Sequence, residues 1–216
     1  MPHDIISGYI VPLSILLPIG MFIFRYRHAN MESKLLFYYL IVAGLINLTA
    51  IGLVKFRMSN LPLLHIYTIV ETTFFMAYFR LIFESKKIKR FLTVVMIGFP
   101  ILCILNFLFI QDLFTYNTYT RPLEAVIITF VCLLYFYKSG FTENWLNNPI
   151  NWLNMGIMIY FPAASIIFIL SNYFVFVLHN YKMANVIWDV HSILVLLMYL
   201  LWAKGFSLIR KSAIGK

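Results

Sequence analysis

The chain has 216 residues, of which 62% are hydrophobic and only 12% are charged, and its formal net charge is +9. An ordinary soluble domain carries about 25% charged residues, so this composition excludes that class and indicates an integral membrane protein. The positive charge does not indicate nucleic-acid binding, because Lys and Arg collect in the loops of membrane proteins for topological reasons.

Long apolar stretches in chain order predict an all-α polytopic membrane protein, a seven-transmembrane-helix bundle formed by one domain over residues 1–216. We expect the spans at approximately 5–25, 35–55, 62–83, 91–111, 119–138, 150–177 and 184–207. Each is near the ~20 residues needed to cross the hydrocarbon layer. The first stretch lacks a positive amino-terminal region and a small-residue cleavage site, so we interpret it as a retained helix and not as a signal peptide.

The distribution of Lys and Arg predicts the orientation of the bundle. With the amino terminus outside and the carboxy terminus inside, only Lys55, Arg57, Arg121 and Lys182 remain on the outer side. All other Lys and Arg residues then fall in the inner loops and the carboxy-terminal tail. This bias is typical of a protein with an N-out, C-in orientation.

The third span, which contains LHIYTIVETTFF, carries polar residues on two faces. His65, Thr68 and Thr72 share one face, because they lie three and four residues apart. Tyr67 and Glu71 share another face. An ionisable group in a bilayer core costs roughly 2.5–3.5 kcal/mol on insertion scales and marks a pathway, a site or an internal pair. Glu71 therefore requires a partner, whereas a purely interfacial position is an alternative for His65.

The fifth span begins YTRPLEAVIITF, and Arg121 and Glu124 within it are three residues apart. One interpretation is a local ion pair along the helix. The functional alternative is that Arg121 presents its guanidinium fork to an anionic group of a ligand.

The sixth and seventh spans add further polar residues. Asn151 and Asn154 are three residues apart, and we expect them to cap the helix start and to form hydrogen bonds between helices. In the seventh span Asp189 and His191 point to nearly opposite faces, whereas Trp188 and His191 share one.

With the spans oriented in this way, most polar residues fall in the outer half of the bundle. Convergence at one depth predicts a polar cavity that opens to the extracytoplasmic side, since charged groups in membranes usually face an interior. The alternative is a set of separate hydrogen bonds between helices. The residues expected to bind a ligand in the cavity are His65, Glu71, Arg121, Glu124, Asp189 and His191.

A metal site is a further alternative, because two histidines and several carboxylates can hold zinc. The candidate ligands are His65, Glu71, Glu124, Asp189 and His191, but the tight spacings HxxxH and HExxH are absent. The sequence specifies no cofactor.

At LHIYTIVE, YTRPLE, NMGIMIYF and WDVHS the chain resembles small uncharacterised bacterial seven-helix integral membrane proteins, along nearly its whole length. The resemblance implies the architecture and no activity. We expect the protein to lie in the bacterial inner (cytoplasmic) membrane. Asp189, His191 and Ser192 are also similar to part of the zinc site of ceramidase and adiponectin-receptor-like hydrolases. Those enzymes use an Asp, a Ser and three His, with a paired HxxxH in the last helix that this chain lacks.

The sequence as a whole predicts a multi-pass membrane protein that binds a small or lipidic ligand in an extracytoplasmic-facing polar pocket, in a sensor-like or transport role. The expected partners are the lipid bilayer, that ligand and a membrane protein that would relay a signal; nucleic acid is not expected. An intramembrane metal-dependent lipid hydrolase is one alternative. A structural or assembly subunit of a membrane complex is the other.

Overall fold

The structure is a computed structural model that describes residues 10–140 and 145–209. All regular secondary structure within these ranges is helical, which confirms the all-α class. The elements are α2 (Val11–Ser14), α3 (Leu16–Ile23), η2 (Tyr26–His28), α4 (Met31–Lys55), α5 (Leu61–Ile82), α6 (Lys86–Phe109), α7 (Thr120–Ser139), η3 (Trp145–Asn147), α8 (Pro149–Asn172), η4 (Tyr173–Val177) and α9 (Tyr181–Ser207).

Five helical segments in the described part of the chain are long and apolar enough to cross a membrane: α4, α6, α7, α8 with η4, and α9. By length and composition, these helices are consistent with the expected helical membrane protein. Helix α5 is of similar length but more polar, and His65, Thr68, Glu71 and Thr72 on it are all buried. Its polar side is accommodated by packing against other helices, because α5 contacts α4, α6 and α7.

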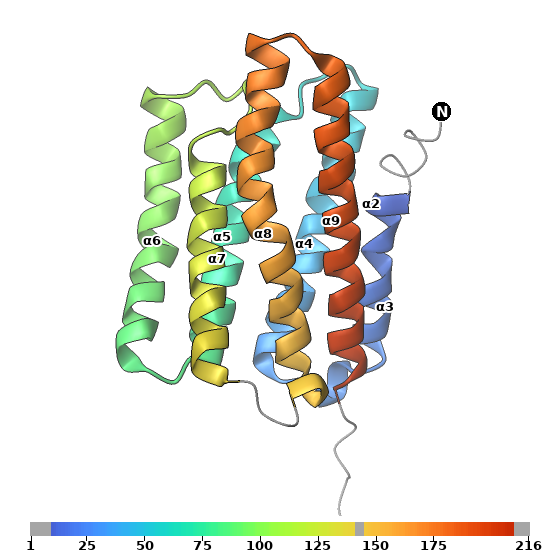
Figure 1. The fold of residues 1–216 in the computed structure, drawn as a ribbon, viewed down its shortest axis with the longest axis vertical. Coiled ribbons are helices and arrows are strands. Elements are labelled where there is room, and N and C mark those ends of the chain that lie inside the picture. The colour runs from blue at the N-terminus through green and yellow to red at the C-terminus, as the bar shows by residue number, and fades with distance from the viewer. Residues whose placement is uncertain (1–9, 141–144, 210–216) are drawn as a thin grey trace, which may run out of the picture.

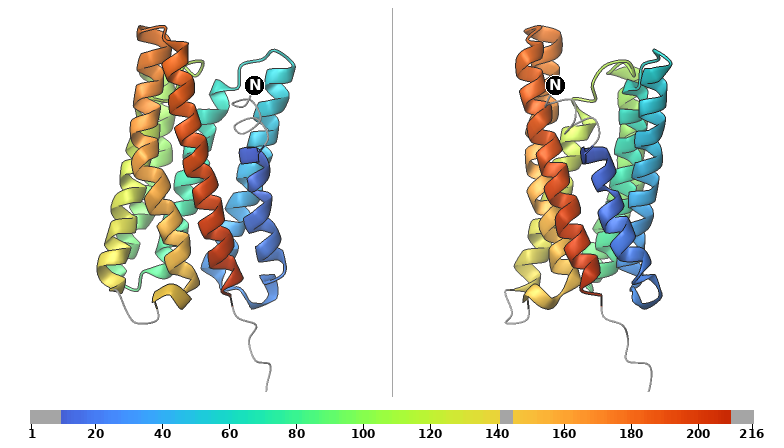
Figure 2. Two further views of the ribbon diagram at one scale, coloured as in Figure 1. Left: turned by 45° about the vertical axis from the view of Figure 1, so that its right-hand side comes forward. Right: turned by 90° about the vertical axis from the view of Figure 1, so that its right-hand side faces the viewer.

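The helices form a ring in which consecutive neighbours are α3, α4, α5, α7, α8 and α9, with α9 returning to α3. Helix α6 lies outside this ring, against α5 (Figure 1). Helix α2 begins partway along the bundle, between α4 and α9 (Figure 2). The ring thus leaves an interior that side chains from six helices can share.

Aromatic side chains fill the interior toward the end of the bundle where α4 begins and α9 ends. Phe75 lies 4.9 Å from Phe161 and 5.0 Å from Tyr39 between ring centroids. Trp202 packs on the same group, 5.9 Å from Tyr39. Such aromatic pairs contribute beyond the area that they bury, so this half of the bundle is a solid core.

Helices α8 and α9 approach each other closely at two glycines. A Cβ atom on Gly156 would lie 2.8 Å from the buried indole ring of Trp202, and one on Gly205 would lie 3.0 Å from the carbonyl oxygen of Pro149. The Trp202 indole nitrogen donates a hydrogen bond of 2.9 Å to the Leu153 carbonyl across this contact. Small residues allow this close approach of two helices in a membrane.

Each of the seven predicted spans overlaps one helix or two consecutive helices of the structure. Residues 5–9 of the first predicted span lie outside the described residues. In the sixth, the α-helix gives way at its carboxy-terminal end to a π-helical segment, η4.

Candidate functional site

A cavity of ≈ 590 Å³ lies inside the ring, in the half of the bundle that contains the α4–α5 loop. Ligand pockets in proteins commonly have volumes of about 300–1,000 Å³. Lys55 and Asn60, at the end of α4 and the start of α5, line its mouth, and Tyr39, Met198 and Tyr199 line its floor above the aromatic core. The cavity therefore runs from one end of the bundle to its middle.

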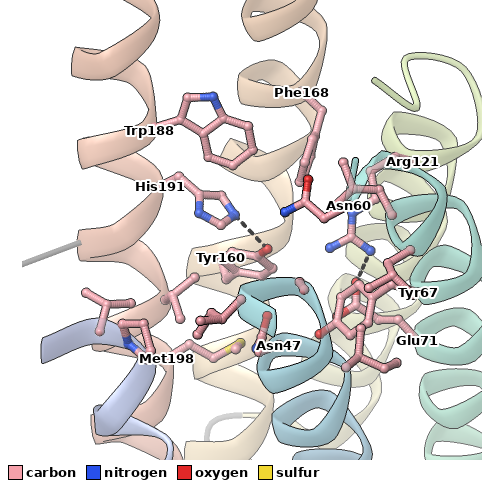
Figure 3. A pocket seen from close by; sticks show the side chains of 18 of the residues that line it. Asn47, Asn60, Tyr67, Glu71, Arg121, Tyr160, Phe168, Trp188, His191 and Met198 are labelled. Carbon is pink, nitrogen blue, oxygen red and sulfur yellow. Dashed lines mark hydrogen bonds and ion pairs between the residues drawn. The ribbon is translucent and has the colours of Figure 1, made fainter. Parts of the chain in front are cut away.

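The walls of the cavity are mainly apolar and aromatic. Phe168 of α8 and Trp188 of α9 form part of one side, and Tyr67 of α5 lies opposite (Figure 3). Aliphatic side chains from four helices complete the lining: Val11, Ile46, Ile51, Val54, Leu63, Leu64 and Val195. A ligand in this space would bury an apolar body.

One wall carries a buried cluster of two carboxylates and a guanidinium. The Arg121 Nη1 atom donates a hydrogen bond to Glu71 of α5 and another, of 2.6 Å, to Glu124 of its own helix. The side chains of Arg121, Glu71 and Glu124 are only 5%, 1% and 0% exposed. The cluster has a formal charge of −1 when both carboxylates are ionised, and of zero when one of them holds a proton.

Hydroxyl groups satisfy the other carboxylate oxygens. The Tyr39 hydroxyl of α4 donates to Glu71 Oε1 and lies 2.6 Å from the Tyr67 hydroxyl. Thr72 donates to Glu124 Oε1 over 2.8 Å. Buried charges are normally stable only with such complete pairing, so the cluster joins α4, α5 and α7 in a single network.

The start of α7 holds Arg121 in place. The Asn117 side-chain oxygen accepts hydrogen bonds of 3.1 Å from the backbone nitrogens of Thr120 and Arg121, which are free donors in the first turn of a helix. The Asn117 amide in turn donates to Thr68 of α5 over 3.2 Å. The Arg121 backbone is thus fixed relative to α5.

Aromatic rings surround the guanidinium of Arg121. Its Cζ atom lies 4.9 Å from the centroid of the Phe168 ring and 5.1 Å from that of Tyr67. A cation over an aromatic face is attracted by the ring quadrupole, more so where water is excluded. In Figure 3 the guanidinium lies between Glu71 on one side and Tyr160 on the other.

A histidine and a tyrosine form the polar part of the wall made by α8 and α9. His191 Nε2 of α9 lies 3.0 Å from the Tyr160 hydroxyl of α8, and either atom can be the donor. The rings of His191 and Trp188 pack with their centroids 5.2 Å apart. The Tyr160 hydroxyl lies between His191 and the Arg121 guanidinium, so it links His191 to the Arg121 cluster (Figure 3).

Three of the six residues predicted to bind a ligand line the cavity: Glu71, Arg121 and His191. Glu124 is fully buried behind this lining and reaches the cavity only through Arg121. The local ion pair predicted from the spacing of Arg121 and Glu124 is therefore present, together with a second carboxylate from α5.

The other two predicted residues are not among the described residues that line the cavity. His65 is buried toward the α6–α7 loop, with Nε2 3.2 Å from the Thr115 carbonyl oxygen. Asp189 lies on α9, half-buried, one residue after Trp188 and therefore turned away from the face that Trp188 and His191 share. Equal depth in the bundle does not bring these two side chains to the same cavity.

The predicted metal candidates are similarly dispersed. No group of three or more His, Cys, Asp or Glu side chains within residues 10–140 and 145–209 is arranged to hold a metal ion. Glu71 and Glu124 share Arg121, whereas His191 bonds to Tyr160. The metal-dependent alternative thus has no set of ligands in the described part of the chain.

Sequence reasoning missed the tyrosines, whose hydroxyls make up much of the polar surface of the cavity. Tyr39, Tyr67, Tyr160 and Tyr199 all line it. The sequence alone assigns most aromatic residues to packing and to the membrane interface, and only the spacing of Tyr67 and Glu71 on one helix face pointed to this role.

A second polar network lies closer to the other end of the bundle. The Tyr135 hydroxyl donates to Asn151 over 2.6 Å, and the Tyr78 hydroxyl donates to Asn154 over 3.2 Å. The first bond connects α8 to α7 and the second connects α8 to α5, which agrees with the hydrogen bonds between helices predicted for these asparagines. The helix cap itself comes from Asn148, which accepts from the Ile150 backbone nitrogen.

Comparisons of this chain with protein-family models, with curated proteins and with solved structures find no match. The function is therefore inferred from the residues and the geometry of the site.

Proposed function

We propose that the protein binds one small or lipidic amphipathic ligand in this cavity, in a sensor-like or transport role. The observation that carries the proposal is the placement of a buried Arg121–Glu71–Glu124 cluster at the wall of an otherwise apolar, aromatic cavity. Pockets that bind small molecules have this composition, with an apolar lining and a few polar groups that fix orientation. The polar head would bind at the cluster, and the apolar body would lie along Phe168 and Val195.

We further propose that the bundle spans the bacterial inner membrane seven times, with α5 and the α2–α3 segment crossing beside the five long apolar segments. Buried polar residues explain the polarity of α5, because they face other helices and not lipid. The α2–α3 segment, Val11–Ile23, is apolar but shorter.

The charge distribution supports an orientation with the cavity mouth on the extracytoplasmic side. Among the described Lys and Arg residues, only Lys55, Arg57, Arg121 and Lys182 lie near the end that contains the mouth. The opposite end carries the other described cations, namely Arg25, Arg27, Lys34, Arg80, Lys86, Lys87, Lys89, Arg90, Lys138 and Lys204. Cytoplasmic loops carry such an excess of Lys and Arg, so a ligand would enter from outside or from the outer leaflet.

The test is retention of a ligand by the purified protein in native mass spectrometry. The protein is incubated with a total lipid extract and then stripped of bulk lipid, and the added mass is measured. We expect one retained molecule in the unchanged protein and its loss in Ala50→Trp, because Ala50 lines the cavity. Leu48→Trp is the matched control, since Leu48 on the same helix is 67% exposed on the outer surface. No retained mass, or equal retention in both variants, would contradict the proposal.

A further inference from the structure

We propose that the ligand carries an anionic head group that binds Arg121, and that Glu71 releases Arg121 by taking up one proton. This inference rests on the proposed function, because it names the head group bound in the same cavity. Glu71 is the partner of Arg121 in the structure, and the head group would replace it as that partner.

The geometry of the Arg121 guanidinium favours an anionic head group. Arginine has five N–H donors in a planar fork that matches carboxylates, sulfonates and phosphates. Glu71 and Glu124 both accept from the same nitrogen, Nη1. Neither carboxylate therefore occupies the edge formed by Nε and Nη2, and the guanidinium lies at the cavity wall between Glu71 and Tyr160 (Figure 3).

The charge of the cavity lining also favours an anionic head group. Among the described residues that line the cavity, Lys55, Arg121 and Glu71 are the charged ones. A cationic head would meet two like charges, one at the mouth and one at the wall. An anionic head would be drawn in by Lys55 and would find a single competitor, Glu71, beside Arg121.

The net charge of the cluster explains why a proton would bind together with the head group. With both carboxylates ionised the cluster already has one excess negative charge, and an anionic head would add a second in a site that water barely reaches. Such a buried excess is strongly unfavourable. If a proton from solvent binds a Glu71 carboxylate oxygen as the head group arrives, the Arg121–Glu71 ion pair opens and the net charge stays unchanged. The Tyr39 hydroxyl, which now donates to Glu71, can accept a hydrogen bond from the protonated form.

The groups that face Glu71 come from every neighbouring helix. They are Tyr39 of α4, Tyr67 of α5 itself, Arg121 and Glu124 of α7, Tyr160 of α8 and Tyr199 of α9, with His191 and Lys55 on the same cavity. Helix α6 lies against the outer side of α5 and has no charged residue after Arg90. Histidine is the side chain in this set that ordinarily titrates near neutral pH, so the test must separate Glu71 from His191.

The test uses three probes with the same tail and fixed charge: octanesulfonate, octyltrimethylammonium and octanol. Their dissociation constants are measured by thermal stabilisation of the protein in phosphatidylcholine nanodiscs, at a series of pH values around neutrality. We expect octanesulfonate to bind at least about tenfold more tightly than the other two. Because one proton is taken up, its affinity should rise by up to about tenfold for each unit by which the pH falls.

Two variants identify the proton acceptor. Glu71→Gln should bind octanesulfonate at neutral pH at least as tightly as the unchanged protein, with an affinity that no longer depends on pH. His191→Gln should retain the pH dependence. Loss of the pH dependence in His191→Gln and not in Glu71→Gln would overturn the assignment.

The outcomes also separate this inference from the proposed function. If octyltrimethylammonium or octanol binds best, or if octanesulfonate binding does not vary with pH, the inference is wrong while ligand binding by the cavity stands. If no probe binds, or if Ala50→Trp does not abolish probe binding, the inference is wrong, and the lipid-retention experiment decides the proposed function separately.

Discussion

Arg121 of α7 and Glu71 of α5 form an ion pair whose side chains are only 5% and 1% exposed. The pair lies at the cavity wall, and a second carboxylate, Glu124, shares the same guanidinium nitrogen. One guanidinium thus serves two buried carboxylates, so the three positions should respond very differently to substitution.

Arg121→Gln should destabilise the protein much more than Glu71→Gln. Removing the cation leaves two buried carboxylates without a partner, and breaking a buried pair in this way costs about 3–5 kcal/mol. Glu71→Gln leaves one carboxylate for one guanidinium and should change stability far less. The measurement is the midpoint of thermal unfolding in detergent, with Arg80→Gln, an exposed site on α5, as the control. Equal losses in the Arg121 and Glu71 variants would show that the charges are not balanced as described.

Gly156→Ala should lower the free energy of unfolding by about 1–3 kcal/mol, the usual cost of overpacking. The new methyl group would lie 2.8 Å from the ring of Trp202, which is fully buried and cannot move aside without disturbing the core. Gly98→Ala is the matched control, because nothing lies within 4 Å of the added atom there. The control should be neutral or stabilising, since Ala favours a helix over Gly. A neutral Gly156→Ala would mean that α8 and α9 are farther apart than the structure has them.

Tyr135→Phe should destabilise the bundle by about 1 kcal/mol, because the Asn151 oxygen loses its donor. Tyr137→Phe on the same helix removes an identical hydroxyl from a side chain that is 84% exposed, and it should have no effect. Urea-dependent unfolding of the two variants in one detergent provides the comparison. Equal stability would remove the evidence for a network between α7 and α8.

Met58→Cys should react with a membrane-impermeant maleimide on intact cells, and Glu84→Cys should react only after the membrane is opened. The two positions are exposed and lie beyond opposite ends of α5. The native Cys103 and Cys132 are 2% and 0% exposed, so they contribute little background. Reversed labelling would contradict the N-out, C-in orientation that the Lys and Arg distribution supports.

Helical periodicity predicted relationships within single helices correctly. On one face of α5, Thr68 accepts a hydrogen bond from Asn117 and Thr72 donates one to Glu124. On the other face, Tyr67 and Glu71 both contact the Tyr39 hydroxyl of α4. On α9, Trp188 and His191 pack together on one face. These features follow from residue spacing, since side chains three or four positions apart lie on the same side of a helix.

Relationships between helices could not be predicted in this way. Glu71 and Arg121 are 50 residues apart, and nothing in one sequence states how far α5 and α7 are rotated toward each other. The predicted depth placed His65 and Asp189 near the cavity, but rotation about the helix axes directs them elsewhere. Hydropathy gives the position of a residue along the membrane normal, and only packing gives the direction in which it points.

The most direct test of ligand binding is an experimental structure of the protein extracted together with its native lipid, examined for density inside the ring of helices. The account predicts continuous density in the ≈ 590 Å³ cavity that extends from Arg121 and Glu71 along Phe168 and Trp188 toward the mouth at Lys55. A cavity closed by inward movement of α4 or α9, or one that holds only isolated water molecules, would contradict it.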